Sequence, residues 1–142
     1  MLFDTHLHLI YTDILRYPWL DKVDLLNKPS RYEDYHTKAS RLGISACLHM
    51  EVDVVENQIK EETKMIHNLI ENNDTIIRGV ISSCRPEKNN FQEMIQNAKA
   101  QRLIKGFRRV LHVAPDNTAR SDQFKKNIRF FLWSYGTTSI YA

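Results

Sequence analysis

Short runs of alternating apolar and polar residues recur along this chain, separated by stretches with helical spacing. The strand-like runs cover residues 2–9, 44–52, 75–83 and 103–112. Between them, apolar side chains return every three or four positions, the spacing of a helix that covers one face of a sheet. The pattern predicts four strand–helix units and an α/β fold, with a fifth strand beginning within residues 137–142.

Residues that favour helix ends mark where the predicted helices start and stop. The predicted first residues or caps are Ser30, Asp53, Asn90 and Ser121. The first three are each followed by a glutamate three positions later, as in a capping box. Gly43 and Gly136 are expected to end the first and the last helix, because glycine adopts the backbone conformation that a helix end needs.

Apolar parallel strands covered by helices occur in doubly wound sheets and in barrels. No glycine-rich phosphate loop follows residues 2–9, which disfavours a dinucleotide-binding sheet. Four strand–helix units are half of a (β/α)8 TIM barrel, which needs about 250 residues. The sequence therefore predicts one domain, residues 1–142, that is truncated to a half-barrel of about four units.

Composition and charge exclude several classes of function. Hydrophobic residues make up 42% and charged residues 26%, as in globular proteins. The net charge of +3 comes from scattered basic residues, so no nucleic-acid partner is expected. No membrane segment and no signal peptide are expected either. Cys47 and Cys84 lie in predicted strands and are interpreted as buried free thiols, which fits the cytoplasm, with a disulfide between them as the alternative.

The predicted strand ends carry the candidate metal ligands. In barrels of this type, the chemistry lies at the C-terminal ends of the strands. His6 and His8 share one strand face with Asp4, because residues two apart point the same way. Two adjacent imidazoles form half of a metal site, and a catalytic zinc ion usually has three protein ligands. Glu51, at the end of the second strand, is the predicted third ligand.

Each of these assignments has a structural alternative. A His-x-His pair in a strand is often a surface or structural feature. Glu51 could instead lie near the start of the following helix, where negative charge is favourable.

Arginines at the third and fourth strand ends are the candidate substrate-binding residues. Arg85 precedes a proline at a strand end, where it could bind an anion or stabilise a turn. Arg108 and Arg109 must point to opposite faces, and alternation favours Arg108 as the inward one. Arg109 is then a structural partner of helix carboxylates. His49 and His112 are interpreted as structural.

Five segments occur in an order that is typical of one family. They are residues 3–8, 16–20, 49–54, 79–87 and 104–112. Together they resemble the amidohydrolase-related TIM-barrel hydrolases, in particular the branch of sugar lactonases such as fuconolactonase and the dicarboxylate lactonases. The resemblance covers about residues 2–131. The histidine pair by itself is less specific, since TatD-type nucleases and PHP phosphoesterases begin in a similar way.

The resemblance implies hydrolysis of a lactone ring or a related ester, with a divalent metal, usually zinc, that activates water. By position, His6 and His8 would be metal ligands, and Glu51 a ligand or a substrate contact. Arg85 and Arg108 would bind the small-molecule substrate. The family also has histidines on strands five and six and a catalytic aspartate on strand eight. This sequence is expected to contain only the start of a fifth strand, and residues 136–142 depart from what the family has there.

Two interpretations follow for the chain. In the first, it is the N-terminal half of a lactonase, or of a TatD- or PHP-like phosphoesterase. In the second, it is a non-catalytic half-barrel. In both, the chain alone is expected to be inactive, and it is expected to associate with itself through open sheet edges and an uncovered apolar face.

Overall fold

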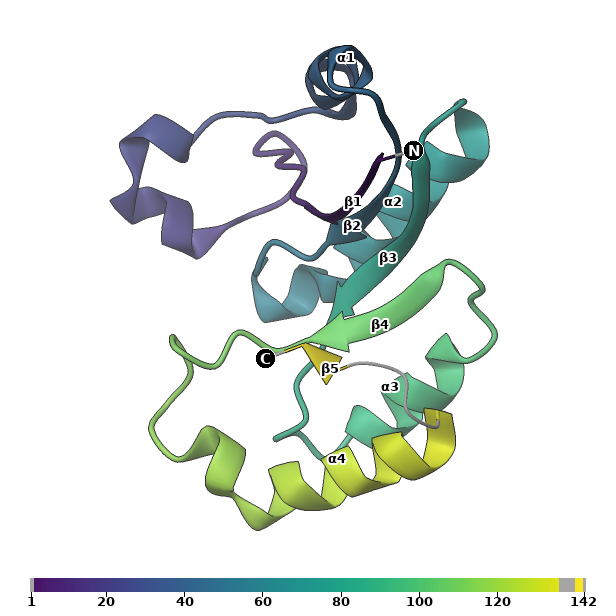
Figure 1. Cartoon of the computed structure of the whole chain (residues 1–142). Helices are drawn as coiled ribbons and strands as arrows, with labels where there is room; N and C mark the ends of the chain where they lie inside the picture. The colour runs from purple at the N-terminus through teal and green to yellow at the C-terminus, as the bar shows by residue number, and fades with distance from the viewer. Residues whose placement is uncertain (1, 136–139, 142) are drawn as a thin grey trace.

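One parallel sheet forms the centre of the computed structural model (Figure 1), which describes residues 2–135 and 140–141. The strands lie in the order β1-β2-β3-β4-β5, and each neighbouring pair is parallel. Spatial order follows chain order because each strand–helix unit adds the next strand beside the last. The predicted α/β fold, with four parallel strands that alternate with helices, is confirmed.

The element bounds are as follows. The strands are β1 (Leu2–Leu7), β2 (Ile44–Met50), β3 (Ile77–Ser83), β4 (Ile104–Arg108) and β5 (Ile140–Tyr141). The α-helices are α1 (Tyr32–Arg41), α2 (Ile59–Asn72), α3 (Phe91–Ala98) and α4 (Asp122–Tyr135). Short 3-10 helices are η1 (Pro18–Lys22), η2 (Asp24–Leu26), η3 (Glu56–Gln58) and η4 (Thr118–Arg120). No helix among these residues has the length and apolar character that a bilayer crossing requires.

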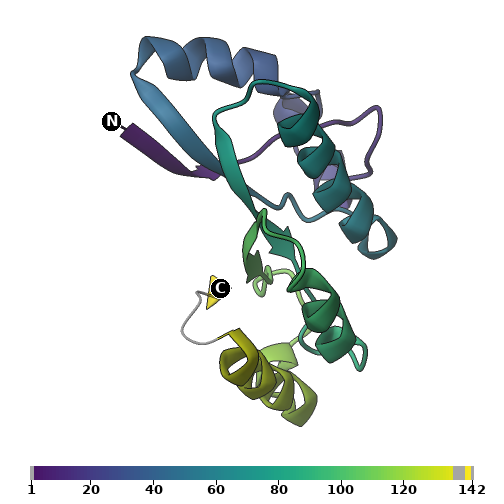
Figure 2. The same cartoon turned by 90° about the vertical axis from the view of Figure 1, so that its right-hand side faces the viewer.

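Helices α2 and α3 lie on the same side of the strands (Figure 2). Ile66 of α2 and Val80 of β3 belong to one buried cluster between these elements. Phe91 of α3, Phe107 of β4 and Phe131 of α4 belong to a second cluster, in which the last two rings meet edge to face with centroids 5.8 Å apart. The apolar stripes read from the sequence therefore form the core on the helix side of the sheet.

The long connection between β1 and α1 extends to one side of the sheet and carries η1 and η2 (Figure 1). Its apolar residues pack against the segment that follows β2, in a cluster that includes Tyr17, Leu20, Val52 and Val54. The Trp19 indole also donates a hydrogen bond of 2.8 Å to the Val52 carbonyl. This packing fixes the backbone just after β2, where the candidate site begins.

The predicted strands are longer than the observed ones. Residues 103–112 were predicted as one strand, but β4 ends at Arg108, because Arg109 turns to bind a carboxylate after β3. β1 ends two residues early, at Leu7 instead of residue 9. The short β5 pairs with β4. Residues 137–139 and 142 of the predicted fifth strand, and the predicted helix end at Gly136, lie outside the described residues.

Two of the predicted helix caps are wrong. Ser30 forms an isolated antiparallel bridge with Ile10, so α1 begins after Arg31 without a side-chain cap. Asp53 adopts a left-handed backbone conformation with φ of 51°, and α2 begins only after Gln58.

The two later caps fall where they were predicted. Asn90 occupies the cap position of α3, although its side chain makes no capping hydrogen bond. The Ser121 hydroxyl accepts a hydrogen bond of 3.3 Å from the Phe124 amide in the first turn of α4. Cys47 and Cys84 are buried free thiols, which excludes a disulfide between them.

Candidate functional site

Two imidazoles stand side by side at the C-terminal end of β1. The Nε2 atoms of His6 and His8 are 3.0 Å apart, and the rings meet edge to face with centroids 4.8 Å apart. His6 is exposed and His8 is partly buried. Asp4 does not join them, because its carboxylate accepts hydrogen bonds from the His6 amide and the Tyr35 hydroxyl, both 2.9 Å long.

A backbone carbonyl sets the protonation of His8. Its Nδ1 lies 3.0 Å from the Met50 carbonyl oxygen, which can only accept, so Nδ1 carries the proton. Burial lowers the pKa of His8, which keeps the ring neutral near pH 7. The Nε2 atom of His8 therefore presents a lone pair towards His6, as a metal ligand must.

Glu51, the predicted third ligand, binds the Asp53 amide and the Arg108 guanidinium instead of facing the histidine pair. Its side chain is 1% exposed, and one carboxylate oxygen accepts a hydrogen bond of 2.9 Å from the Asp53 amide. The other oxygen lies 3.1 Å from Nη1 of Arg108. Burial raises the pKa of Glu51, while the Asp53 amide and the Arg108 guanidinium act in the opposite direction.

The structure does not assemble His6, His8 and Glu51 into one ligand set. Within residues 2–135 and 140–141, no three histidine, cysteine, aspartate or glutamate side chains lie close enough together to hold a metal ion. The physical reason is that a buried carboxylate needs a compensating charge, and Arg108 supplies it to Glu51. The histidine pair provides two ligands, which is fewer than a catalytic zinc site usually has.

Arg108, the last residue of β4, and Arg109, the next residue, bind different carboxylates. Arg108 reaches across to the end of β2, where Nη1 also donates a hydrogen bond of 3.3 Å to the Glu51 carbonyl. Arg109 is 8% exposed and binds both carboxylate oxygens of Glu87, with the shortest contact at 2.7 Å. Arg109 thus has the structural role that was predicted, but its partner lies in the turn after β3, not in a helix.

Arg85 is held by its own chain at the end of β3. Its guanidinium donates hydrogen bonds of 2.8 Å to the Ser83 hydroxyl and 2.9 Å to the Cys84 carbonyl. It also pairs with Asp53 at 3.2 Å. The left-handed backbone at Asp53 turns the chain after β2 so that this residue can bind both Glu51, through its amide, and Arg85, through its carboxylate.

One buried acid next to the segment after β2, Glu62 of α2, was not predicted from the sequence. It is 2% exposed, and its Oε1 accepts a hydrogen bond of 2.9 Å from the Val52 amide. Burial raises its pKa to about 8, helped by the nearby Glu51 and Asp53 carboxyls. The signal was present, because Glu62 falls within the apolar stripe of its helix, three residues after Ile59.

His49 is also buried, with 0% exposure, and among the described residues neither ring nitrogen has a hydrogen-bond partner. Burial lowers its pKa to about 3, so the ring is neutral at physiological pH. His112 is exposed in the loop after β4. Neither histidine joins the His6–His8 pair among the described residues.

The strand ends therefore collect two kinds of group. His6 and His8 offer imidazole nitrogens, and the charge of Arg108 helps to lower the pKa of His8. Arg108 and Arg85 offer guanidinium groups, each tethered by a carboxylate of the segment after β2. Imidazole nitrogens suit a borderline divalent cation such as zinc, and guanidinium groups suit an oxygen-rich anion.

Comparisons with known proteins point to one kind of fold. No protein-family model matches the chain, and no curated protein matches it either. Among solved structures, an amidohydrolase 2 from Bifidobacterium longum subsp. infantis is similar over 95% of this chain and 48% of its own, with 19% identity and a TM-score of 0.66. An amidohydrolase from Burkholderia multivorans with bound zinc is similar over 93% and 45%, with 15% identity and a TM-score of 0.73.

A probable 2-pyrone-4,6-dicarboxylic acid hydrolase from Acinetobacter baumannii, solved with citric acid bound, is similar over 91% of this chain and 45% of its own. The identity is 13% and the TM-score 0.58. At these identities the likeness concerns the fold, which is that of part of an amidohydrolase barrel. The chain spans about half the length of the structures that it resembles.

Proposed function

We propose that this chain contributes to a metal-dependent hydrolase of the amidohydrolase type, acting on a lactone or a related ester. The observation that carries the proposal is the His6–His8 pair, whose Nε2 atoms are 3.0 Å apart at the end of the first strand. The fold likeness to amidohydrolases supports it, because the pair lies where barrels of this kind carry their chemistry.

The donor set of the pair fits a divalent metal, most simply zinc. Both donors are imidazole nitrogens, and the carbonyl of Met50 already orients His8 as a metal ligand. Such an ion, when bound, polarises a carbonyl group and lowers the pKa of a water molecule. Glu51 would become a metal ligand only if its ion pair with Arg108 broke. While that ion pair is formed, the role of Glu51 is to position Arg108.

Arg108 and Arg85 are the proposed substrate-binding residues. In the contacts described, Arg108 uses only Nη1, which leaves its other donors for a carboxylate or hydroxyl of the substrate. Arg85 is more constrained, because Nη1 and Nη2 both bind the chain itself. One structural neighbour holds citric acid, which is consistent with a small oxygen-rich ligand for this fold.

We propose that the 142 residues alone do not turn over substrate. Among the described residues, the histidine pair has no third ligand. Further ligands and a base would then come from polypeptide outside these residues. The exposed edge of β1, where Leu2 is 57% and Phe3 47% exposed, favours self-association of the isolated chain. The buried free thiols favour a cytoplasmic location.

Zinc binding and lactone hydrolysis test the two parts of this proposal separately. Zinc affinity is measured by competition with a chromophoric chelator, for the wild type and for the double variant His6→Ala/His8→Ala. The matched control is His36→Ala/His112→Ala, which removes two histidines away from the pair. We expect the wild type to bind zinc weakly, and only His6→Ala/His8→Ala to lose this binding. Equal binding by all three proteins would refute the metal assignment.

The second part of the proposal is checked with the same proteins and a panel of sugar lactones. The isolated chain is expected to show no hydrolysis above the zinc-containing buffer. Robust turnover by the isolated chain, abolished in His6→Ala/His8→Ala, would instead show that the residues present here suffice.

A further inference from the structure

A cavity of about 670 Å³ lies between α2 and α3 on the helix side of the sheet. Its size is within the range of small-molecule pockets, which is about 300–1,000 Å³. α2 contributes one face of its helix, namely Lys60, Thr63, Lys64 and His67. His6, His8 and Arg108 do not line it, so it is distinct from the histidine pair.

The inner wall of the cavity is apolar. It is lined by Ile59, Phe91, Met94, Ile104 and Phe107. Phe91 and Phe107 belong to the second core cluster, so their positions are fixed by packing on α4 and β4. Met94 is only partly buried, and its flexible thioether can adapt to the shape of a ligand. The apolar part of a ligand would therefore be well accommodated here.

The charge around the cavity favours an anion. Among the lining residues, Lys88 pairs with Glu56 at 3.2 Å, and Arg85 pairs with Asp53 at 3.2 Å. Lys60 and Lys64, one helical turn apart on α2, have no ion-pair partner among the described residues. Glu93 of α3 is the remaining acid, so the unpaired charge of the lining is positive.

A neutral polar group completes the lining. Nε2 of His67 is buried and has no hydrogen-bond partner among the described residues. Burial lowers the pKa of His67, so near pH 7 this nitrogen belongs to a neutral ring that can bind a carboxyl oxygen or a hydroxyl group. A buried polar atom without a partner costs free energy, and a ligand would offset that cost.

We propose that this cavity binds a small carboxylic acid with an apolar body. The carboxylate lies near Lys60 and Lys64, and the apolar body packs on Phe91 and Met94. The site does not depend on the proposed metal or on lactone hydrolysis, so either proposal can fail without the other. Arg85, after the C-terminal end of β3, lines the cavity and also belongs to the candidate site. The acid in the cavity and the proposed substrate would therefore lie on either side of Arg85.

Octanoate is a suitable probe, and 1-octanol is its uncharged counterpart. Binding to the full 142-residue chain is followed by amide chemical shifts in a ¹H–¹⁵N NMR titration. The proposal expects saturable shifts confined to α2, α3 and the adjoining ends of β3 and β4. The double variant Lys60→Gln/Lys64→Gln should bind octanoate about tenfold more weakly, since each exposed charge contributes modestly.

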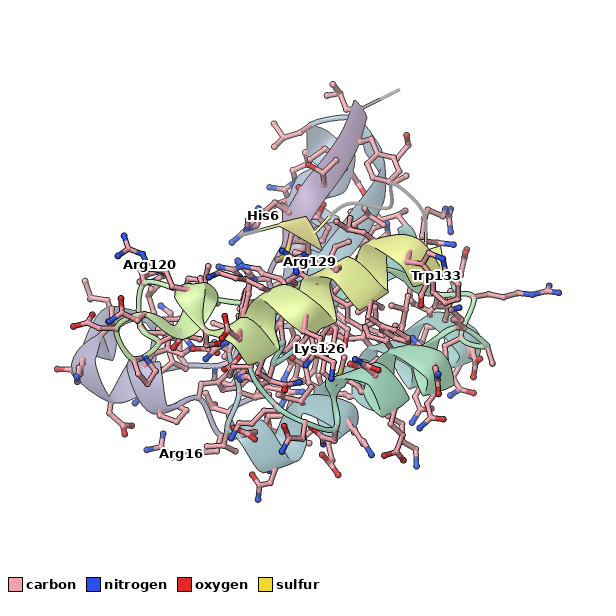
Figure 3. The ribbon with its side chains drawn as sticks, turned by 90° about the horizontal axis from the view of Figure 1, so that it is seen from below. His6, Arg16, Arg120, Lys126, Arg129 and Trp133 are labelled. Atoms are coloured by element: carbon pink, nitrogen blue, oxygen red, sulfur yellow. The ribbon has the colours of Figure 1, made fainter. Side chains whose placement is uncertain are left out.

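The matched control is Lys125→Gln/Lys126→Gln, which removes the same charge from two exposed positions on α4. Lys126 is labelled in Figure 3. It should bind octanoate like the wild type, and 1-octanol should bind more weakly than octanoate. Equal binding of octanoate by the two double variants would overturn the proposal. So would equal binding of octanoate and 1-octanol, or shifts that appear only at β1 or near the exposed Trp133.

Discussion

Replacing Glu62 by glutamine should make the stability of the protein less dependent on pH above about 6.5. Glu62 is 2% exposed and binds the Val52 amide, and burial raises its pKa from 4.5 to about 8. A carboxyl group whose pKa is higher in the folded state than in the unfolded state contributes its full stabilisation at pH values below the unfolded-state pKa. That contribution is lost as the pH rises through the folded-state pKa. Glutamine keeps the size and the hydrogen-bond acceptor but cannot ionise.

The size of the effect follows from the proton affinity. Each tenfold difference in proton affinity corresponds to about 1.4 kcal/mol. Between the unfolded-state and folded-state pKa of Glu62, the wild type therefore loses up to about 1.4 kcal/mol of stability for each pH unit. Between pH 6.5 and 8 this amounts to roughly 2 kcal/mol. His49 acts in the opposite direction, because its pKa is lowered to about 3, but its contribution is complete above about pH 6.5.

The assay is urea unfolding followed by tryptophan fluorescence at several pH values from 6.5 to 8.5. We expect the unfolding free energy of the wild type to fall across this range, while that of Glu62→Gln stays nearly level. Glu61→Gln is the control, because Glu61 is the exposed neighbour on the same helix. Parallel pH profiles for the wild type and Glu62→Gln would refute the reasoning.

Three further predictions concern packing, pairing and association. Gly79→Ala should destabilise the fold by about 1–3 kcal/mol in urea unfolding, because the new Cβ would lie 3.0 Å from the Leu103 carbonyl and meet the Lys105 side chain; a neutral effect would contradict the close approach of β3 and β4. A double-mutant cycle with Arg109→Met and Glu87→Gln should give a coupling of about 1–3 kcal/mol, since the pair is two-pronged and largely buried; additive effects would show that the pair contributes nothing. In sedimentation, the purified chain should be larger than its 16.8 kDa monomer, and Phe3→Lys should reduce association by charging the exposed edge of β1; a monodisperse wild-type monomer would contradict this.

The parallel sheet could be predicted from the sequence because the spacing of apolar residues in each segment agrees with the strand or helix that the segment forms. Apolar strand runs and helical stripes such as Ile59, Thr63 and Ile66 specify which face of each element is buried. The strand order then follows from chain connectivity. The helix starts at Ser30 and Asp53 could not be predicted, because tertiary contacts override the local cap signal. Ser30 pairs with Ile10 across the loop, and Asp53 binds Arg85.

Strand alternation was enough to predict the adjacency of His6 and His8, but not the environment of Glu51. Whether a carboxylate faces a metal or an arginine depends on which side chain from another strand reaches it. Arg108 is 57 residues away in sequence from Glu51, and no local pattern links the two. Glu62 lies in the apolar stripe of its helix, but its charge is typical of an exposed residue, so the two sequence signals conflict. Buried acids of this kind are found by asking which charged residues share a core-facing stripe.

The most direct test of the central claim is a long-range ¹H–¹⁵N spectrum of the imidazole nitrogens, recorded with and without one equivalent of zinc. The sequence contains six histidines, which the spectrum resolves individually. Without zinc, we expect His8 to be neutral with its proton on Nδ1. With zinc, we expect the Nε2 resonances of His6 and His8 to shift together, while those of the other four histidines stay in place. Zinc shifts at other histidines, or none at this pair, would contradict the claim that His6 and His8 hold one metal ion between them.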